Sequence, residues 1–264
     1  MHNAFVAVWR FRAFILAAVR AEFRGRFSRS RLGGLWHVLQ PLAQAGIFAL
    51  ALTEVVRAKL PAAAGGAGYA FYLLAGMAAW TLFSEILNRC LNIFIEFSSL
   101  LKKISFPRMS LPVIVLLSAL LNHGLLLVAT AVILAMLGHF PNLYWLYLIP
   151  AIVTIAMLAF GIGLLLGVFN VFSRDVTQVM SVVTQAWFWL TPIVYPIEAL
   201  PERIRGYVAL NPMTALARIY QDAIAFDRPP DLLAAAPAFL LTLALLGLAL
   251  IVFRAASADV VDAL

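Results

Sequence analysis

Long apolar stretches recur along the chain and are separated by short polar segments. A helix rises about 1.5 Å per residue, so about 20 apolar residues cross the roughly 30 Å hydrocarbon core of a bilayer. Six stretches reach that length, and each predicts a membrane-spanning helix. The predicted spans are residues 35–56, 69–95, 111–137, 143–172, 176–197 and 232–253.

The segment between the fifth and sixth spans has a different pattern. Tyr207 to Tyr220 is apolar but only 14 residues long, and Asn211-Pro212 interrupts it. This length favours a re-entrant element, so we expect residues 198–226 to form a helical hairpin that dips into the membrane from the extracytoplasmic side. Non-helical backbone is tolerated at that depth only where protein or a water-filled cavity satisfies it. An extramembrane loop with a buried helix is the alternative.

The N-terminal segment, residues 1–34, is too charged to span a membrane. Its large apolar residues recur every four positions, as on one helix face, at Phe11, Ile15, Val19, Phe23 and Phe27. An Arg-rich helix with an aromatic face is typical of segments that lie in the cytoplasmic headgroup layer. The predicted fold is therefore an all-α polytopic membrane protein, with an amphipathic interface helix in 1–34 and a six-span domain in 35–264.

Composition agrees with a membrane protein. Hydrophobic residues make up 64% of the chain and charged residues 12%, and the mean hydropathy is +0.98. A soluble domain has roughly 45–50% apolar and about 25% charged residues, so a soluble globule, a disordered chain and a coiled coil are excluded. The single cysteine, Cys90, excludes a disulfide-stapled fold. The first apolar run is short and interrupted by Arg10, Arg12 and Arg20, so we expect no cleavable signal peptide.

The net charge of +7 is distributed as a topology signal. In a soluble protein it would indicate a nucleic-acid partner. Here twelve Lys and Arg residues flank one side of the predicted spans and six flank the other. The positive-inside rule then places both termini in the cytoplasm, in agreement with an even number of spans, and we expect an inner-membrane location and no nucleic-acid partner.

Several kinds of chemistry have no signal in this sequence. The three lysines, Lys59, Lys102 and Lys103, do not follow glycine or precede Ser or Thr, so the chain has no P-loop. The four histidines and one cysteine have no metal-ligand spacing, and for His123 an interhelical hydrogen bond is favoured over a ligand role. We expect no catalytic residue, metal or cofactor on this chain. A membrane-embedded lipid-processing enzyme with scattered site residues stays open as an alternative.

Four motifs occur in a definite order. An Arg-rich helix leads into a first motif made by Ser30, Leu32, Gly33, Leu35, Trp36, Pro41 and Leu42. The others are Lys102–Arg108 followed by Pro112, then Asn170–Asp175, then Thr191–Pro196 followed by Leu210-Asn211-Pro212. Over about residues 20–225 this order resembles the permease subunits of ABC-2 type exporters of polysaccharides such as O-antigen or teichoic acid. Arg29 and Arg31 make the gate region more basic than the family pattern.

The resemblance implies a homodimer of this chain with two copies of a separate ATPase subunit, which would bind ATP and Mg. It also implies a polyprenyl-pyrophosphate-linked polysaccharide as substrate, O-antigen in the first place, exported to the periplasm. Six helices are few to enclose a sugar chain, which agrees with a second copy completing the channel. An ABC-2 permease for a drug, haem or lipid and a stand-alone channel are alternatives.

The loop of residues 98–110 is the predicted ATPase-coupling element. It is short, basic and contains an aromatic residue before a proline, and the resemblance assigns coupling to it. The coupling residues are Lys102, Lys103, Phe106, Pro107 and Arg108. A plain positive-inside loop is the alternative.

A run of arginines is the predicted gate, where the pyrophosphate of the substrate would bind. It consists of Arg20, Arg24, Arg26, Arg29 and Arg31. Arginine presents planar, bidentate donors to phosphate oxygens. Binding of ordinary anionic lipid, worth about 1 kcal/mol per charge, is the alternative.

Aromatic residues near the extracytoplasmic ends of spans two and five are the predicted channel lining, because sugar rings stack their C–H faces on aromatic faces. They are Trp80, Phe83, Trp187, Trp189 and Tyr195. An interfacial aromatic belt and packing between helices are the alternatives. Within span two, Glu85 and Arg89 have the spacing of an intrahelical ion pair, and a water-filled lumen is the other environment that suits them.

Overall fold

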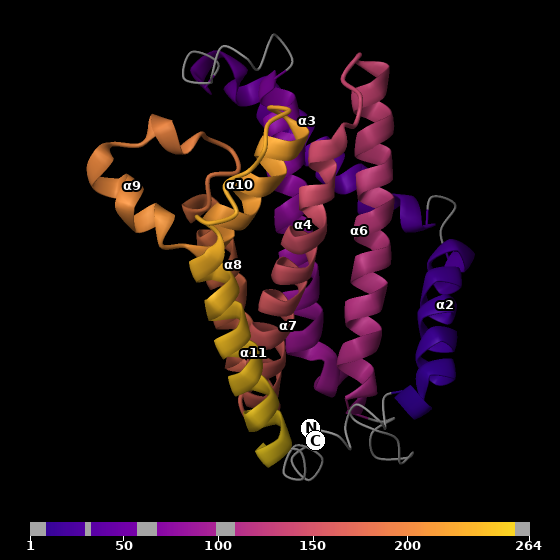
Figure 1. Ribbon diagram of the computed structural model, residues 1–264. Coiled ribbons are helices and arrows are strands. Elements are labelled where there is room, and N and C mark those ends of the chain that lie inside the picture. The colour runs from indigo at the N-terminus through magenta and orange to yellow at the C-terminus, as the bar shows by residue number, and fades with distance from the viewer. Residues whose placement is uncertain (1–8, 30–32, 57–67, 99–108, 257–264) are drawn as a thin grey trace.

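The computed structural model describes residues 9–29, 33–56, 68–98 and 109–256, and every regular element in these ranges is helical (Figure 1). Four segments are long and apolar enough to cross a membrane. They are α4 (Gly68–Glu96), α6 (Ser110–Met136), the 3₁₀ turn η4 (Leu143–Tyr147) continued by α7 (Leu148–Phe172), and α11 (Ala236–Ala256). The expectation of an all-helical polytopic membrane protein is confirmed.

The two other predicted spans coincide with helices that are not among these four. The first span matches α3 (Trp36–Val56), which follows the 3₁₀ turn η1 (Gly33–Leu35) and whose described apolar stretch is Val38–Ala51. The fifth matches α8 (Asp175–Leu190), whose 16 residues extend about 24 Å. This helix ends before residue 197, the end of the predicted span, because Pro192 disfavours helical backbone in the preceding residue.

The last membrane helix also begins later than predicted. The Asp231 carboxylate accepts hydrogen bonds from the backbone N–H groups of Leu233 and Ala234, at 3.0 and 3.1 Å. These bonds hold the chain in a turn, so α11 begins at Ala236 rather than at residue 232.

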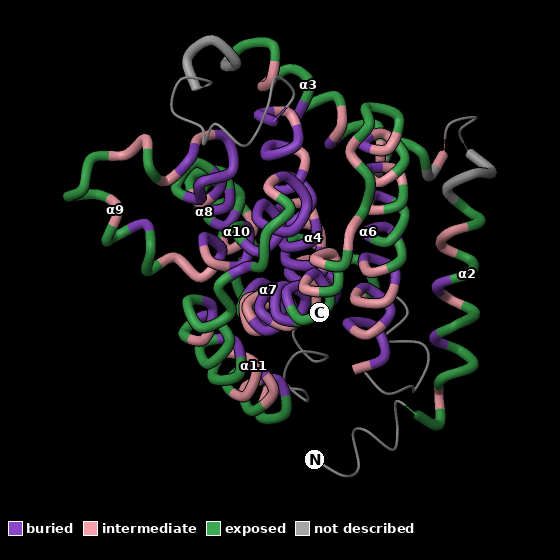
Figure 2. Tube along the Cα trace, turned by 45° about the horizontal axis from the view of Figure 1, so that its top comes forward, coloured by how far each residue is buried: buried purple, intermediate pink, exposed green. Residues whose placement is uncertain are grey.

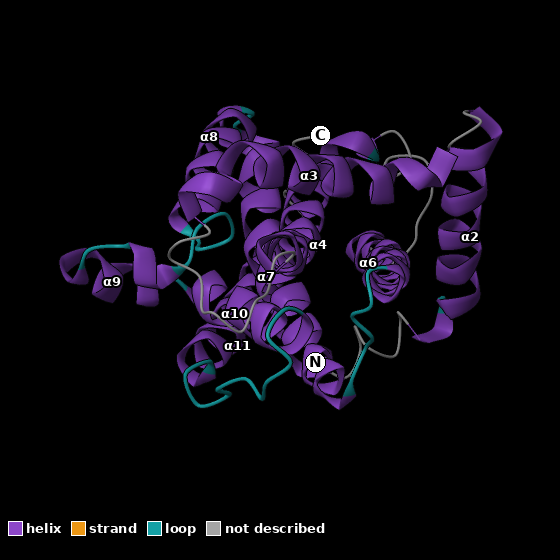
Figure 3. Cartoon of the chain, turned by 90° about the horizontal axis from the view of Figure 1, so that it is seen from above, coloured by secondary structure: helices purple, strands orange, loops and turns teal. Residues whose placement is uncertain are grey.

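The helix α4 lies at the centre of the bundle and is buried along most of its length, as the purple tube in Figure 2 shows. Seen from above, α7 lies beside it while α2 (Arg12–Arg29) and α9 (Glu202–Ala209) lie at opposite edges (Figure 3). Two glycines of α7 allow the closest approach to α4. A Cβ added at Gly163 would lie 2.7 Å from the Cβ of Cys90, and one at Gly167 would lie 2.6 Å from the carbonyl oxygen of Cys90.

Two elements extend from this core. The helix α2 lies along α6, where Ile15 and Val19 form a small buried cluster with Ile114. The predicted hairpin segment contains α9 and α10 (Pro212–Ile224), joined at Asn211, whose side chain caps α10 by accepting from the N–H of Met213 at 3.0 Å. The helix α10 is buried, whereas α9 projects from the bundle (Figures 1 and 2).

Candidate functional site

A groove between α3, α4 and α8 is the main candidate site, and it has a volume of about 520 Å³. Each helix lines it with one face, because its lining residues recur at spacings of three and four. From α3 the lining residues are Gln40, Pro41, Gln44 and Phe48. From α4 they are Met77, Trp80, Thr81, Ser84 and Asn88. From α8 they are Ser181, Thr184, Gln185, Phe188 and Trp189.

Polar and aromatic side chains divide this α3–α4–α8 groove into two halves. We call the end where α4 and α7 finish and α8 begins the Asn170 end, and the opposite end the α10 end; in Figure 1 they are below and above. Because α8 runs opposite to α4, the amide of Asn88 and the hydroxyl of Ser181 both lie toward the Asn170 end. The aromatic rings lie toward the α10 end.

The aromatic half is one contacting cluster. The ring of Phe188 stacks on Phe48 with 6.2 Å between centroids and meets Trp80 edge-on at 5.5 Å. The indole of Trp189 contacts both Phe48 and Phe188, at 6.1 and 5.5 Å. Trp80 and Phe188 are nearly buried, whereas Trp189 is 49% exposed, so the cluster presents ring faces to the groove while packing behind it.

The five aromatic residues predicted from sequence therefore have different environments. Trp80 and Trp189 line the groove. Phe83 is completely buried and meets the ring of Trp187 at 4.9 Å, one layer behind the lining. Tyr195 lies beyond the end of α8 and donates its hydroxyl to the Trp189 carbonyl oxygen at 2.7 Å.

Asn211 connects the motifs at the α10 end. Its side-chain oxygen accepts from the indole N–H of Trp187 at 2.8 Å, and its amide donates to the Thr191 hydroxyl at 2.9 Å. The Thr191–Pro196 segment and the Leu210-Asn211-Pro212 segment are thereby joined. Trp187 holds this junction, which the sequence pattern alone does not indicate.

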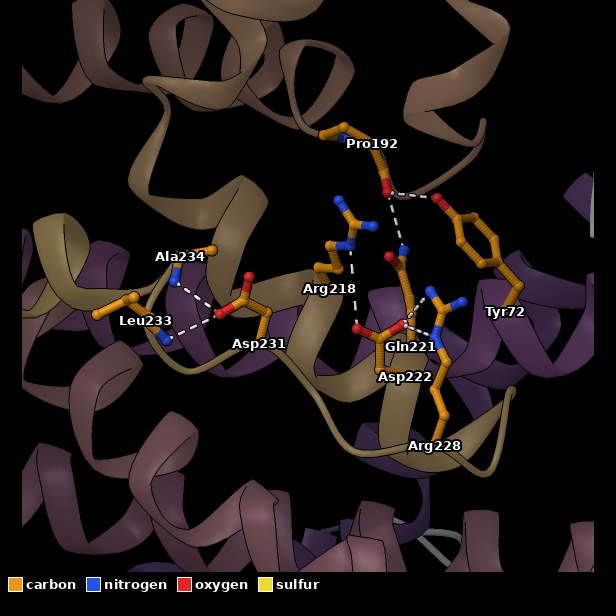
Figure 4. A network of polar contacts seen from close by, with 9 residues as sticks. All are labelled: Tyr72, Pro192, Arg218, Gln221, Asp222, Arg228, Asp231, Leu233 and Ala234. Carbon is orange, nitrogen blue, oxygen red and sulfur yellow. Dashed lines mark hydrogen bonds and ion pairs between the residues drawn. The ribbon is translucent and has the colours of Figure 1, made fainter.

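A second group of contacts anchors α10 to α4 (Figure 4). The Pro192 carbonyl oxygen accepts from the Gln221 amide and from the Tyr72 hydroxyl, each at 2.8 Å. Asp222 is paired with Arg228 at 2.6 Å. Burial raises the pKa of the Asp222 carboxyl, and the hydrogen bond and charge of Arg228 act in the opposite direction, so this arginine favours the ionised form.

The Asn170 end is held by the polar turn of the third motif. The Asn170 amide donates to the Leu91 carbonyl oxygen at 3.0 Å, and its side-chain oxygen accepts from the Thr177 hydroxyl at 2.8 Å. Thr177 also donates to the side-chain oxygen of Asn92 at 3.0 Å. One buried asparagine thus links the end of α7 to both α4 and α8.

The predicted Glu85–Arg89 pair belongs to a larger network between α2, α4 and α6. Arg89 lies 3.6 Å from Glu85 in its own helix but only 2.8 Å from Glu22 of α2. Glu22 also accepts from the Ser118 hydroxyl at 2.8 Å, and Glu85 accepts from the Asn122 amide at 2.6 Å. The network fixes α2 against the bundle.

The arginine run lies on and after α2. Arg20 and Arg24 are exposed and border a groove between α2 and α6. Arg31 and the side chains of Arg26 and Arg29 lie outside the described part of the structure. All five predicted coupling residues, Lys102 to Arg108, lie outside it as well. Within the described residues, no group of three His, Cys, Asp or Glu side chains is placed to hold a metal ion.

Comparison with known proteins identifies relatives over most of the chain. The O-antigen export system permease protein RfbA of Myxococcus xanthus is 29% identical over 228 residues, which is 85% of this chain and 85% of that protein. A protein of the same name from Klebsiella pneumoniae is 28% identical over 79% of this chain and 78% of its own length. The polysialic acid transport protein KpsM of Escherichia coli is 23% identical over 77% and 78%.

The family comparison agrees with these relatives. The family model described as ABC-2 type transporter matches residues 14–224. This range includes most of α2, the α3–α4–α8 groove and both helices of the hairpin segment. The resemblance seen in the sequence motifs is confirmed, and the chain belongs to the ABC-2 type transporter family.

Proposed function

We propose that this chain is the transmembrane subunit of an ATP-driven exporter that moves a polyprenyl-pyrophosphate-linked polysaccharide, O-antigen in the first place, from the cytoplasm to the periplasm. The α3–α4–α8 groove carries this proposal. Its polar half offers amides and hydroxyls to sugar hydroxyls, and its aromatic half offers ring faces to the C–H faces of sugars. The names of the relatives, O-antigen export permease and polysialic acid transport protein, support the same substrate class.

The channel is proposed to form between two copies of the chain. The groove reaches the molecular surface at Trp189, which is 49% exposed, and α8 also exposes Gln178 and Leu190. A second copy in a homodimer would close the groove and cover these side chains. Trp80 and Trp189 would contact the glycan, while Phe83, Trp187 and Tyr195 would support them.

The proposed membrane arrangement has six spans, with both termini in the cytoplasm of a bacterial inner membrane. The spans are α3, α4, α6, α7 with η4, α8 and α11, and the α9–α10 segment is the re-entrant hairpin on the periplasmic side. The helix α8 is short, but the chain continues beyond Leu190 in a turn. Tyr72 and Gln221 donate hydrogen bonds to the Pro192 carbonyl oxygen of this turn, so the non-helical backbone has partners inside the membrane and the segment would cross the bilayer. The helix α2 would lie at the cytoplasmic face.

Energy is proposed to come from two copies of a separate ATPase subunit that bind ATP and Mg, because this chain lacks a P-loop. The 98–110 segment would couple them to α4 and α6, with Phe106 seated in the ATPase. We expect Phe106→Ala to insert normally in the membrane but to lower ATP-dependent export. Wild-type export by this variant would contradict the coupling role.

The arginine run, Arg20 to Arg31, is proposed to bind the pyrophosphate of the substrate at headgroup depth. The exposed positions of Arg20 and Arg24 on α2 support this role, since guanidinium groups there reach the lipid phosphates.

The proposed function is tested with the permease and its ATPase subunit purified together by a tag on the permease. We expect a stable complex whose ATP hydrolysis is stimulated by polyprenyl-pyrophosphate-linked glycan. If no ATPase subunit co-purifies, and the chain alone conducts solute or modifies lipid, the protein is a channel or an enzyme and not an exporter. Stimulation by a drug or haem in place of the glycan would indicate a different substrate class.

Trp189→Ala tests the aromatic half of the groove. Loss of one aromatic contact, worth about 0.5–1.5 kcal/mol, should weaken the apparent affinity for the glycan about two- to tenfold. Val182→Ala is the matched control, because Val182 is an exposed residue of the same helix outside the groove lining. Equal glycan responses from the two variants would exclude Trp189 from the glycan path.

A further inference from the structure

A second groove, between α2 and α6, has a volume of about 500 Å³ and is not used by the translocation path proposed above. Its walls are almost entirely apolar and include Val19 and Phe23 from α2 and Leu121, Leu125 and Val128 from α6. It shares no lining residue with the α3–α4–α8 groove. Its volume lies within the range of about 300–1,000 Å³ found for ligand pockets.

Two features keep this α2–α6 groove open. Gly124 lies in its wall, and a Cβ added there would meet no atom within 4 Å, so the missing side chain leaves empty space. The helix α2 is fixed by Glu22, which pairs with Arg89 and accepts from Ser118, each at 2.8 Å. The groove is therefore bounded by two helices whose relative position is fixed by polar contacts outside it.

The charge at its border is positive. Arg20 and Arg24 lie one helical turn apart, are exposed and contribute to the groove wall. Neither pairs with a carboxylate among the residues that the structure describes. An apolar groove bordered by two available guanidinium groups is complementary to a hydrocarbon chain attached to a phosphate group.

The proposed topology also gives the groove a suitable depth. The 27 residues of α6 extend about 40 Å, longer than the roughly 30 Å hydrocarbon core. If the surplus projects at the cytoplasmic end, Leu120, about 15 Å from the start of α6, lies just inside the hydrocarbon. The long side chains of Arg20 and Arg24 then reach the headgroup layer, while Leu125 and Val128 continue into the membrane.

We infer that this groove is the docking site for the hydrocarbon chain of the polyprenyl-pyrophosphate carrier, with its pyrophosphate on Arg20 and Arg24. The inference rests on the proposed function and adds a place for the lipid outside the translocation groove. Two guanidinium groups one helical turn apart, those of Arg20 and Arg24, suit a pyrophosphate, because a pyrophosphate has two anionic phosphate groups. In the chain, α2 is followed by η1 and then by α3, which lines the translocation groove. The docked carrier therefore lies beside the segment that leads to this groove.

The test measures binding of undecaprenyl pyrophosphate, without a glycan, to the full complex in phosphatidylcholine nanodiscs. Gly124→Leu fills the groove, and Gly247→Leu is its matched control, because Gly247 also faces open space but lies in α11. We expect Gly124→Leu, and the double variant Arg20→Gln with Arg24→Gln, to weaken binding at least about tenfold and Gly247→Leu to leave it unchanged. Excess phosphatidylglycerol should not displace the probe.

Three outcomes would overturn the inference. These are absence of probe binding to the wild-type complex, wild-type affinity in Gly124→Leu, and displacement by phosphatidylglycerol, which would make the groove a general site for anionic phospholipid. Failure of the proposed function looks different. If probe binding depends on Gly124 but the glycan-linked lipid does not stimulate ATP hydrolysis, the docking site is supported and glycan export is contradicted.

Discussion

At the scale of single residues, buried polar side chains decide how the helices are joined. Asn170 is completely buried, yet its amide and its side-chain oxygen both have partners on other helices. In an apolar interior an unpaired amide is costly, so such a residue selects one arrangement of its neighbours. The Asn-x-x-x-Arg-Asp turn thus gains a structural role in addition to its position in the family pattern.

Asn170→Ala should lower the free energy of unfolding by about 1–3 kcal/mol, because it leaves the Leu91 carbonyl and the Thr177 hydroxyl without their bonds to this side chain. Thermal unfolding of the purified chain in detergent measures the effect. Asn88→Ala is the control, since Asn88 is exposed and its amide donates only within its own helix, to Ser84 at 2.8 Å. If the two variants have the same melting temperature, Asn170 does not stabilise the bundle.

The ion pair in α4 illustrates what residue spacing predicts and what it misses. The separation of Glu85 and Arg89 indicates an intrahelical pair, and the two side chains do lie near each other, at 3.6 Å. The shorter contact of Arg89, at 2.8 Å, is with Glu22, which is 67 residues earlier in the chain. Helical periodicity reports only neighbours within one helix, so the contact that attaches α2 had no sequence signal.

At the scale of elements, the packing of α7 on α4 depends on two small residues four positions apart. Gly163 and Gly167 form a Gly-x-x-x-Gly pattern, which in membrane helices allows backbones to approach closely. The close contacts with Leu87 and Cys90 are the evidence for its role.

Gly167→Ala should destabilise the bundle by about 1–3 kcal/mol, because the new Cβ would lie 2.6 Å from the Cys90 carbonyl oxygen and the helices would have to separate. Gly247→Ala is the matched control. Its Cβ meets no atom within 4 Å, and alanine favours the helix, so its stability should be unchanged or higher. The melting temperatures of the two variants in detergent distinguish them, and a Gly167→Ala protein as stable as wild type would contradict close packing.

At the scale of the whole molecule, the two ends of the bundle differ in construction. At the Asn170 end α4, α6, α7 and α8 begin or finish around the Asn170 contacts. At the α10 end the hairpin segment covers the bundle and α9 projects from it (Figure 1). The proposed topology, which rests on the positive-inside rule, has the first end in the cytoplasm and the second in the periplasm.

Cysteine labelling tests this orientation. Cys90 is buried, so the wild-type chain should not react with a membrane-impermeant maleimide and provides the background. We expect Phe140→Cys and Gly206→Cys, both near the α10 end, to react in intact spheroplasts. Arg174→Cys, an exposed position at the Asn170 end, should react only in inverted vesicles. The reverse pattern would invert the topology and contradict export from the cytoplasm.

The sequence alone determined the class of the molecule. Apolar runs long enough to cross a bilayer must become helices there, because lipid offers no partner for backbone polar groups, and this identified the membrane helices. Motifs in a fixed order then identified the family. The sequence does not determine which aromatic side chains face a groove: Trp80 and Phe83 are both aromatic residues of the same predicted span, but only Trp80 lines a groove, and Phe83 is buried.

Tertiary structure alone decided which faces meet. Whether an aromatic ring lines a groove or packs behind it depends on the rotation of three helices about their axes, which the sum of many side-chain contacts determines. The same holds for Glu22 and Arg89, and for the groove left empty at Gly124. Local sequence determines helices through the bonds of each residue to its neighbours along the chain. The α3–α4–α8 groove joins residues from 40 to 189 and the α2–α6 groove joins residues from 19 to 128, and these contacts exist only once the helices have packed.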